Sequence, residues 1–144
     1  VSVLEFGAGR RVLEQFLPDD CRYIPSDIVD RGGGTIACNL NLMPLPAFPP
    51  FNVVVFSGVL FWVTDVPFLT GHLGAACTTV AASSAPATDR SFRSLMRRRR
   101  HGWVNDYDLG ELTALFAVAG FQCRQEQRVM GQEIMLFSRP AVAA

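Results

Sequence analysis

An apolar run at the start of the chain is followed directly by two closely spaced glycines, and this pattern restricts the folds that the chain can adopt. Residues 1–6 form a β-type run with Glu5 near its end, and Gly7 and Gly9 follow, spaced by one residue. Glycine permits a tight turn and lets a ligand approach the backbone where a Cβ would block it. Apolar residues then recur at helical spacing, at Val12, Leu13, Phe16 and Leu17. We therefore expect a helix around residues 10–17, whose first N–H groups are free, as in a nucleotide-type cofactor site.

Strand-like and helix-like segments alternate along the rest of the chain. Helices are expected at residues 66–73, after Asp65, and at 109–119, where Asp108 and Glu111 form a capping signal. Further strands are expected at 21–26, 35–38, 53–56, 76–82, 121–129 and 132–138. This order predicts an α/β fold: a Rossmann-like, mostly parallel sheet with helices on both faces and a C-terminal antiparallel hairpin.

Composition narrows the range of partners. The 144 residues are expected to form a single domain, 1–144, with a formal net charge of zero. Residues 89–101 hold six arginines against one acid, and the run at 97–100 is interpreted as a solvated helix face or loop. Nucleic-acid binding is disfavoured because the chain is not basic overall. Four scattered cysteines predict reduced thiols in a cytoplasmic protein, and no apolar run is long enough to span a bilayer. The oligomeric state is not predicted.

Polar residues stand where several of the expected strands end. In open α/β sheets the ligand lies outside the carboxyl ends of the strands. The residues at these ends are Glu5, Asp27, Asn39 and Ser57. Two carboxylates suit a ligand with a positive charge and a diol, and they are poor neighbours for a pyrophosphate.

Five segments, in order, resemble motifs of the class I S-adenosylmethionine-dependent methyltransferases. Glu5-Phe-Gly7-Ala-Gly9 is similar to the acidic-x-Gly-x-Gly motif after the first strand, and Asp27 matches the acidic residue that closes the second. Cys38–Asn41 resembles the Asp-Leu-Asn type segment after the third strand, and Asn52–Leu60 resembles the strand-four motif. Ala119-Gly120-Phe121 resembles the entry to the terminal hairpin. Together the segments cover nearly the whole chain.

The resemblance implies S-adenosylmethionine as the cofactor and assigns its contacts. Glu5 would bind the ammonium of the methionine portion directly or through water, and Asp27 would accept hydrogen bonds from the ribose hydroxyls. Asn39 and Leu40 would flank the adenine. The complete implied set is Glu5, Gly7, Gly9, Asp27, Asn39, Leu40, Ser57 and Gly58.

Several positions depart from the family pattern. Arg11 stands where a third glycine is frequent, Asn39 and Asn52 stand where aspartate is common, and Phe61 stands where an acidic residue is frequent. The family's helix before the first strand is expected to be absent from this chain. A methyltransferase-like binding module without turnover therefore remains an alternative. An NAD(P)-dependent oxidoreductase is a weaker one, because its Gly-x-Gly-x-x-Gly motif needs glycine at Val12.

The acceptor is less defined than the cofactor. His101 is either a base that removes a proton from a hydroxyl acceptor or a surface histidine. Candidate acceptor-binding residues, which could equally be packing residues, are Phe61, Trp62, Trp103 and Asn105. No Asn-Pro-Pro-Tyr type signature of nucleic-acid amino methylases is present, so a small-molecule acceptor is favoured, with oxygen as the first candidate atom. No metal site is predicted.

Overall fold

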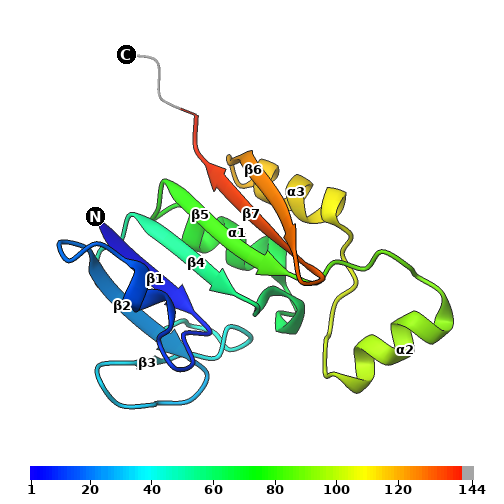
Figure 1. Cartoon of the computed structure of the whole chain (residues 1–144), viewed down its shortest axis with the longest axis horizontal. Coiled ribbons are helices and arrows are strands. Elements are labelled where there is room, and N and C mark those ends of the chain that lie inside the picture. The colour runs from blue at the N-terminus through cyan, green and yellow to red at the C-terminus, as the bar shows by residue number, and fades with distance from the viewer. Residues whose placement is uncertain (141–144) are drawn as a thin grey trace.

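A seven-stranded sheet of order β3-β2-β1-β4-β5-β7-β6 runs through the protein (Figure 1). The computed structural model describes residues 1–140. The strands are β1 (Ser2–Phe6), β2 (Arg22–Asp27), β3 (Ile36–Ala37), β4 (Val53–Ser57), β5 (Thr79–Ser84), β6 (Gln122–Val129) and β7 (Gln132–Ser138). Strands β1 to β5 are parallel, whereas β7 is antiparallel to both β5 and β6. The expected mostly parallel sheet with a terminal hairpin is confirmed.

The hairpin turn follows from two residues with left-handed backbone. Met130 has φ 50° and Gly131 has φ 80°. Positive φ at both central residues is the geometry of a two-residue turn whose twist matches that of the flanking strands. The hairpin inserts β7 between β5 and β6, so the last strand of the chain is internal to the sheet.

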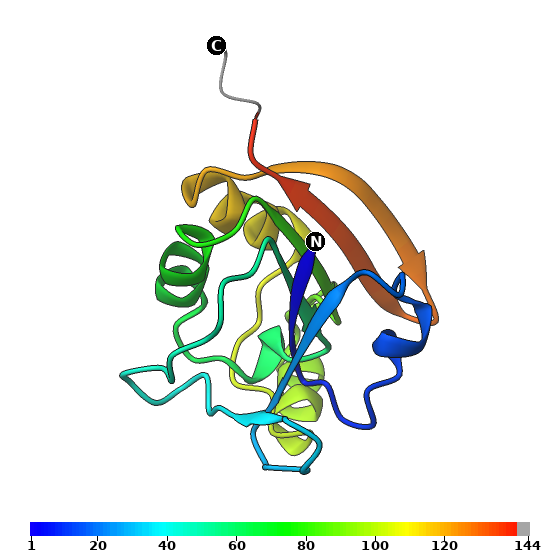
Figure 2. The same ribbon diagram turned by 90° about the vertical axis from the view of Figure 1, so that its left-hand side faces the viewer.

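Two helices cover one face of this sheet (Figure 2). Helix α1 (Val66–Gly74) begins at Asp65, whose side chain accepts a 3.0 Å hydrogen bond from the Phe68 amide. Helix α3 (Leu109–Val118) begins with the expected capping box. The helices pack on the side chains that β1, β4, β5 and β7 direct to this face, which are almost fully buried: Leu4, Val54, Phe56, Val80, Met135 and Phe137.

The opposite face of the sheet has no such layer. Within residues 1–140 it is covered only in part, by the short 3-10 helix η1 (Leu13–Phe16). Burial alternates accordingly along β7: Met135 is fully buried, whereas its neighbours Ile134 and Leu136 are 44% and 38% exposed. The sequence predicted helices on both faces; the described part of the chain forms one helical layer.

The expected helix at residues 10–17 was wrong. Arg11 adopts φ 59°, so the glycine turn extends one residue further than expected, and Pro18 follows soon after. Too few residues remain to offset the cost of starting an α-helix. The predicted apolar side of this helix is instead open, with Phe16 78% exposed.

The arginine run lies on helix α2 (Phe92–Arg100), which projects away from the sheet (Figure 1). It is not uniformly solvated. Arg98 is 7% exposed and donates hydrogen bonds to the Asp106 carboxylate at 3.0 Å and to the carbonyls of Ala85 and Asn105. Its guanidinium also lies 4.8 Å from the Trp103 ring centroid. Arg98 therefore fastens α2 to the loop that follows it. No helix within residues 1–140 has the length and apolar character needed to cross a membrane.

Replacing Arg98 tests this role, and its neighbour Arg97, which is exposed, provides a matched control. We expect Arg98→Ala to lower the free energy of unfolding by roughly 2 kcal/mol, because it leaves the carbonyls of Ala85 and Asn105 without this donor and leaves Asp106 with Arg99 alone. Arg97→Ala is expected to leave it unchanged within experimental error. Urea denaturation followed by circular dichroism measures both, and equal effects of the two changes would contradict the assignment.

Candidate functional site

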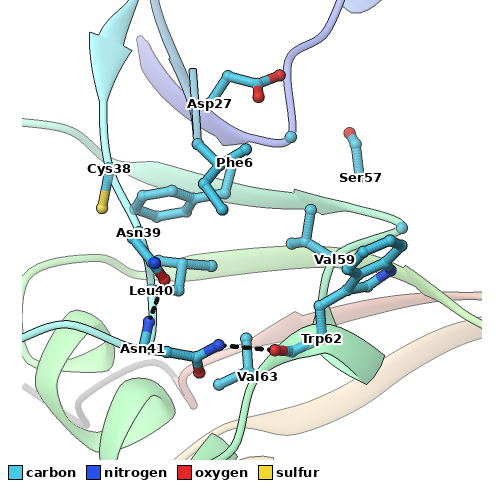
Figure 3. A pocket seen from close by; sticks show the side chains of 13 residues that line it. Phe6, Asp27, Cys38, Asn39, Leu40, Asn41, Ser57, Val59, Trp62 and Val63 are labelled. Atoms are coloured by element: carbon cyan, nitrogen blue, oxygen red, sulfur yellow. Dashed lines mark hydrogen bonds between the residues drawn. The ribbon is translucent and has the colours of Figure 1, made fainter. Parts of the chain in front are cut away.

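A pocket of about 290 Å³ opens at the carboxyl ends of β1, β2 and β4 (Figure 3). Six of the eight residues expected to contact the cofactor line it: Gly7, Asp27, Asn39, Leu40, Ser57 and Gly58. Glu5 and Gly9 do not line it. Three of the four residues that the sequence places at strand ends, Asp27, Asn39 and Ser57, therefore lie together at this pocket.

Strand register brings three of these residues to the same level. Phe6 pairs with Ser26 on one side and with Phe56 on the other. The next residue of each strand is Gly7, Asp27 or Ser57. Because parallel strands end at the same edge, a backbone turn, a carboxylate and a hydroxyl are held side by side.

Close packing explains the glycine at position 7. Gly7 has φ 76°, and a Cβ there would lie 2.4 Å from Cγ1 of Val59 and 2.9 Å from the Ser57 carbonyl oxygen. Any larger residue would therefore push the turn away from the pocket wall. The turn ends in Arg11, whose guanidinium donates to the Gly33 carbonyl at 2.6 Å and to the Glu14 carboxylate at 2.7 Å. Arg11 thus links the turn to the glycine-rich loop after β2.

Asp27 organises the wall next to this turn. Its Oδ2 accepts hydrogen bonds from the Gly9 amide at 2.8 Å and from Arg31 Nε at 3.2 Å, while Oδ1 receives only a 3.4 Å contact from the Val29 amide. Burial opposes ionisation of this carboxyl, but the hydrogen bonds from Gly9, Val29 and Arg31 outweigh it and lower the pKa of Asp27 below its ordinary value. Asp27 is therefore ionised at neutral pH, and Oδ1 can accept further hydrogen bonds.

Glu5 lies behind the pocket wall and not in it. The side chain is 3% exposed, and its Oε1 accepts a 2.5 Å hydrogen bond from the Ser57 hydroxyl. Its Oε2 accepts one from the Tyr23 hydroxyl. Burial raises the pKa of Tyr23 far above its ordinary value, and the hydrogen bond to Glu5 and the charge of Glu5 add to this effect. The pocket therefore meets Glu5 only through Ser57.

The pocket also contains residues that sequence reasoning missed. Asn41 donates to the Trp62 carbonyl at 2.8 Å and accepts from the Thr64 amide at 2.8 Å, so it ties the loop after β3 to the 3-10 helix η2 (Leu60–Trp62). Cys38 also lines the pocket, and burial raises the pKa of its thiol. Both residues are next to the predicted Asn39-Leu40 pair in the sequence, and this position is the signal that could have identified them.

Of the residues proposed for the acceptor, only Trp62 lines the pocket, and it is 51% exposed there. Phe61 is buried and packs on Trp103 with ring centroids 4.5 Å apart. Asn105 donates to the carbonyls of Leu60 and Val63, both at 2.8 Å, and these two hydrogen bonds hold η2 in place. His101 is exposed at the C-terminal end of α2 and lies outside the pocket.

Comparison with known proteins identifies the fold. No family model matches the chain, and no curated protein matches it. Solved structures do match. One chain of the complex between the Haloferax volcanii Trm112 methyltransferase activator and a methyltransferase superposes with a TM-score of 0.73 at 9% identity, covering 99% of this chain and 83% of that one. Mitomycin 7-O-methyltransferase matches with a TM-score of 0.70 at 14% identity. The chain has the class I methyltransferase fold.

A third match extends the comparison. Burkholderia thailandensis 1,6-didemethyltoxoflavin-N1-methyltransferase, solved with its substrate and S-adenosylhomocysteine, superposes with a TM-score of 0.69 at 19% identity, covering 96% of this chain and 70% of that one. The alignment with mitomycin 7-O-methyltransferase covers 97% of this chain and 49% of the other, so this methyltransferase-fold chain spans about half of that enzyme's length. At such identities the likeness establishes the fold.

The lowered pKa of Asp27 predicts how its contribution to stability depends on pH. Because the pKa of Asp27 is lower in the folded protein than in the unfolded chain, ionised Asp27 stabilises the fold at pH values above 3.8. This stabilisation is lost as the pH falls through the pKa that Asp27 has in the folded protein. At about pH 6 we expect Asp27→Asn to lower the free energy of unfolding by roughly 1–2 kcal/mol. The difference between the two proteins should shrink as the pH falls through 3.8 and further below it. Urea denaturation across this range tests it, and a difference that does not change with pH would contradict the assignment.

Proposed function

We propose that this chain binds S-adenosylmethionine in the pocket and transfers its methyl group to a small-molecule acceptor. The strongest support is the strand register, which places Gly7, Asp27 and Ser57 at the same level at the carboxyl ends of three adjacent strands. The sheet that contains these strands has the strand order of the class I methyltransferase fold. The matched toxoflavin-type methyltransferase was solved with S-adenosylhomocysteine bound. The comparison and the pocket chemistry thus favour the same cofactor.

The residues present fit this cofactor. Oδ1 of Asp27 has acceptor capacity for a ribose diol, and the Asn39 amide and the apolar Leu40 suit the edge and the face of an adenine. Neither arginine nor lysine is among the pocket-lining residues of the described chain. A cofactor that contains an ammonium and a sulfonium would therefore meet no repelling charge on these walls.

A dinucleotide fits less well. The pyrophosphate of a nicotinamide cofactor binds to free N–H groups at a helix N-terminus after the glycine turn. Within residues 1–140 the glycine turn is followed by a 3-10 segment and not by an α-helix, and the Gly9 amide already donates to Asp27. The oxidoreductase alternative therefore lacks its main anion-binding element.

The chain's own contribution to methyl transfer would be positioning. Bound S-adenosylmethionine would supply a methyl group activated by the positive sulfur. Trp62 offers an exposed indole at the rim of the pocket that also includes Ser57 and Gly58, and a flat acceptor could stack against it there. Holding an already nucleophilic acceptor in line can supply most of the acceleration. His101 is outside the pocket, so the proposal gives it no proton to move.

The acceptor atom is proposed from chemistry alone. Oxygen remains the first candidate, but the matched enzymes include one named for an O-methyl transfer and one for an N1-methyl transfer. The fold therefore serves both kinds of acceptor, and the panel used to test turnover should contain phenols, alcohols and ring nitrogens.

Isothermal titration calorimetry with S-adenosylhomocysteine and NAD tests the cofactor. We expect heat with S-adenosylhomocysteine only, and at least tenfold weaker binding for Asp27→Ala, which removes the charged acceptor for the ribose. Asp20→Ala changes an exposed loop carboxylate and should bind like the wild type. No binding, or undiminished binding by Asp27→Ala, would overturn the cofactor assignment. Binding without methyl transfer to any member of the panel would instead favour a binding module.

A further inference from the structure

Helix α2 presents an outer face for which the proposed function has no use. Its inner side is fixed to the following loop, because Arg98 and Arg99 both donate hydrogen bonds of 3.0 Å to the Asp106 carboxylate. Arg99 also donates to the Trp103 carbonyl at 2.9 Å. The outer face forms a surface recess that shares no lining residue with the cofactor pocket. The side chains that line this recess are Phe92, Arg93, Met96, Arg97 and Arg100.

The spacing of these residues makes the outer face both apolar and positively charged. Phe92, Met96 and Arg100 are four residues apart, and Arg93 and Arg97 form the neighbouring row. Residues at this spacing lie next to one another on a helix surface. The Phe92 side chain is 81% exposed and that of Met96 is 42% exposed. Large exposed apolar side chains beside arginines are typical of a basic amphipathic helix that lies on a surface.

The positive charge of this face is not balanced within the protein. Whereas Arg98 forms an ion pair with Asp106, the three arginines of the outer face form none in the described part of the chain. The acidic residue closest to them in sequence is Asp89, and its carboxylate oxygens accept hydrogen bonds from Ser91. A chain with a formal net charge of zero thus has a local excess of positive charge here. An anionic partner would complement it.

The apolar side chains favour an anionic lipid surface over a nucleic acid. Helix α2 projects away from the sheet, so its outer face is free to lie against a broad plane (Figure 1). The arginines could meet the phosphates of either partner, but Met96 has no ring on which a base could stack and no hydrogen-bond donor. At a bilayer interface, Phe92 and Met96 would enter the acyl boundary while the arginine side chains extend to the headgroups.

We propose that helix α2 docks the protein on an anionic lipid surface, with Phe92 and Met96 in the apolar boundary and the three arginines of the outer face at the lipid phosphates. Such docking needs no membrane-spanning segment. Because α2 has only nine residues and two apolar anchors, the binding should be reversible. It should also weaken as salt is added, since the arginines act from an exposed surface.

Cosedimentation with phospholipid vesicles, in the absence of any cofactor, tests the charge. We expect the wild type to bind vesicles that contain phosphatidylserine at least about tenfold more tightly than vesicles of phosphatidylcholine alone. The double variant Arg93→Ala, Arg97→Ala should lower binding to the anionic vesicles about 30-fold, which is about fivefold for each arginine. The matched control is Arg10→Ala, Arg22→Ala, which removes the same charge from two exposed arginines that form no ion pair in the described chain. It should bind within about twofold of the wild type.

A second pair of variants tests the apolar contact. Phe92→Ala should weaken binding to the anionic vesicles by about fivefold or more, because the side chain no longer enters the acyl boundary. Phe16, which is 78% exposed on η1, provides the control, and Phe16→Ala should bind like the wild type. Circular dichroism shows whether each variant is folded, which we expect because every altered side chain is exposed.

Three results would overturn this docking role: no binding of the wild type to anionic vesicles, equal losses in the two double variants, or unchanged binding by Phe92→Ala. Binding to single-stranded RNA that Arg93→Ala, Arg97→Ala abolishes, in a protein that does not bind vesicles, would assign the face to a nucleic acid instead. Because no cofactor is present, any of these results leaves the proposed function standing. Conversely, a protein that binds vesicles but not S-adenosylhomocysteine would retain this role and lose the proposed function.

Discussion

The parallel register of β1 with β2 and β4 is the constraint on which the site depends. It places the glycine turn, the Asp27 carboxylate and the Ser57 hydroxyl at one level of the sheet. A slip of one residue would turn each side chain to the opposite face. Asp27 would then leave the pocket, and the Glu5 carboxylate would be directed into the core beside Phe56. The buried apolar residues of β1 and β4 oppose such a slip, so the packing that stabilises the sheet also sets the geometry of the pocket.

The walls of the pocket are held by hydrogen bonds between the loops that surround it. Asn41 joins the loop after β3 to η2, and Asn105 holds η2 from the other side. Arg98 fastens the segment that contains Asn105. The exposed Trp62 indole is therefore supported by a backbone fixed from two directions, which is what positioning an acceptor requires.

Much of this arrangement could be predicted from local sequence. Apolar runs that end in polar residues gave the strands and the position of the pocket, because the ligand edge of a parallel sheet follows from strand direction alone. The capping signal at Asp108 and the turn at Met130-Gly131 also depend on neighbouring residues only, and both were confirmed.

The errors arose where a distant partner decides the outcome. The spacing of Val12 and Phe16 suggested a helix, but the left-handed backbone at Arg11 depends on contacts with Glu14 and the carbonyl of Gly33, 22 residues further on. Four adjacent arginines look alike in sequence, whereas in the fold Arg98 is the buried one, bound to Asp106 and to the carbonyls of Ala85 and Asn105. The motif places Glu5 next to the pocket, but its side chain does not line it, because its oxygens accept hydrogen bonds from the hydroxyls of Tyr23 on β2 and Ser57 on β4.

The single helical layer has a thermodynamic consequence. Apolar side chains on the open face, such as Ile134 and Leu136, remain partly hydrated in the folded state. The heat capacity of unfolding grows with the apolar surface newly exposed to water, at about 12–15 cal/mol/K per residue in ordinary globular proteins. A sheet that is already hydrated on one side exposes less new apolar surface to water when it unfolds. The described chain should therefore have a heat-capacity change below that range, and its stability should vary less steeply with temperature than that of a sheet covered on both faces.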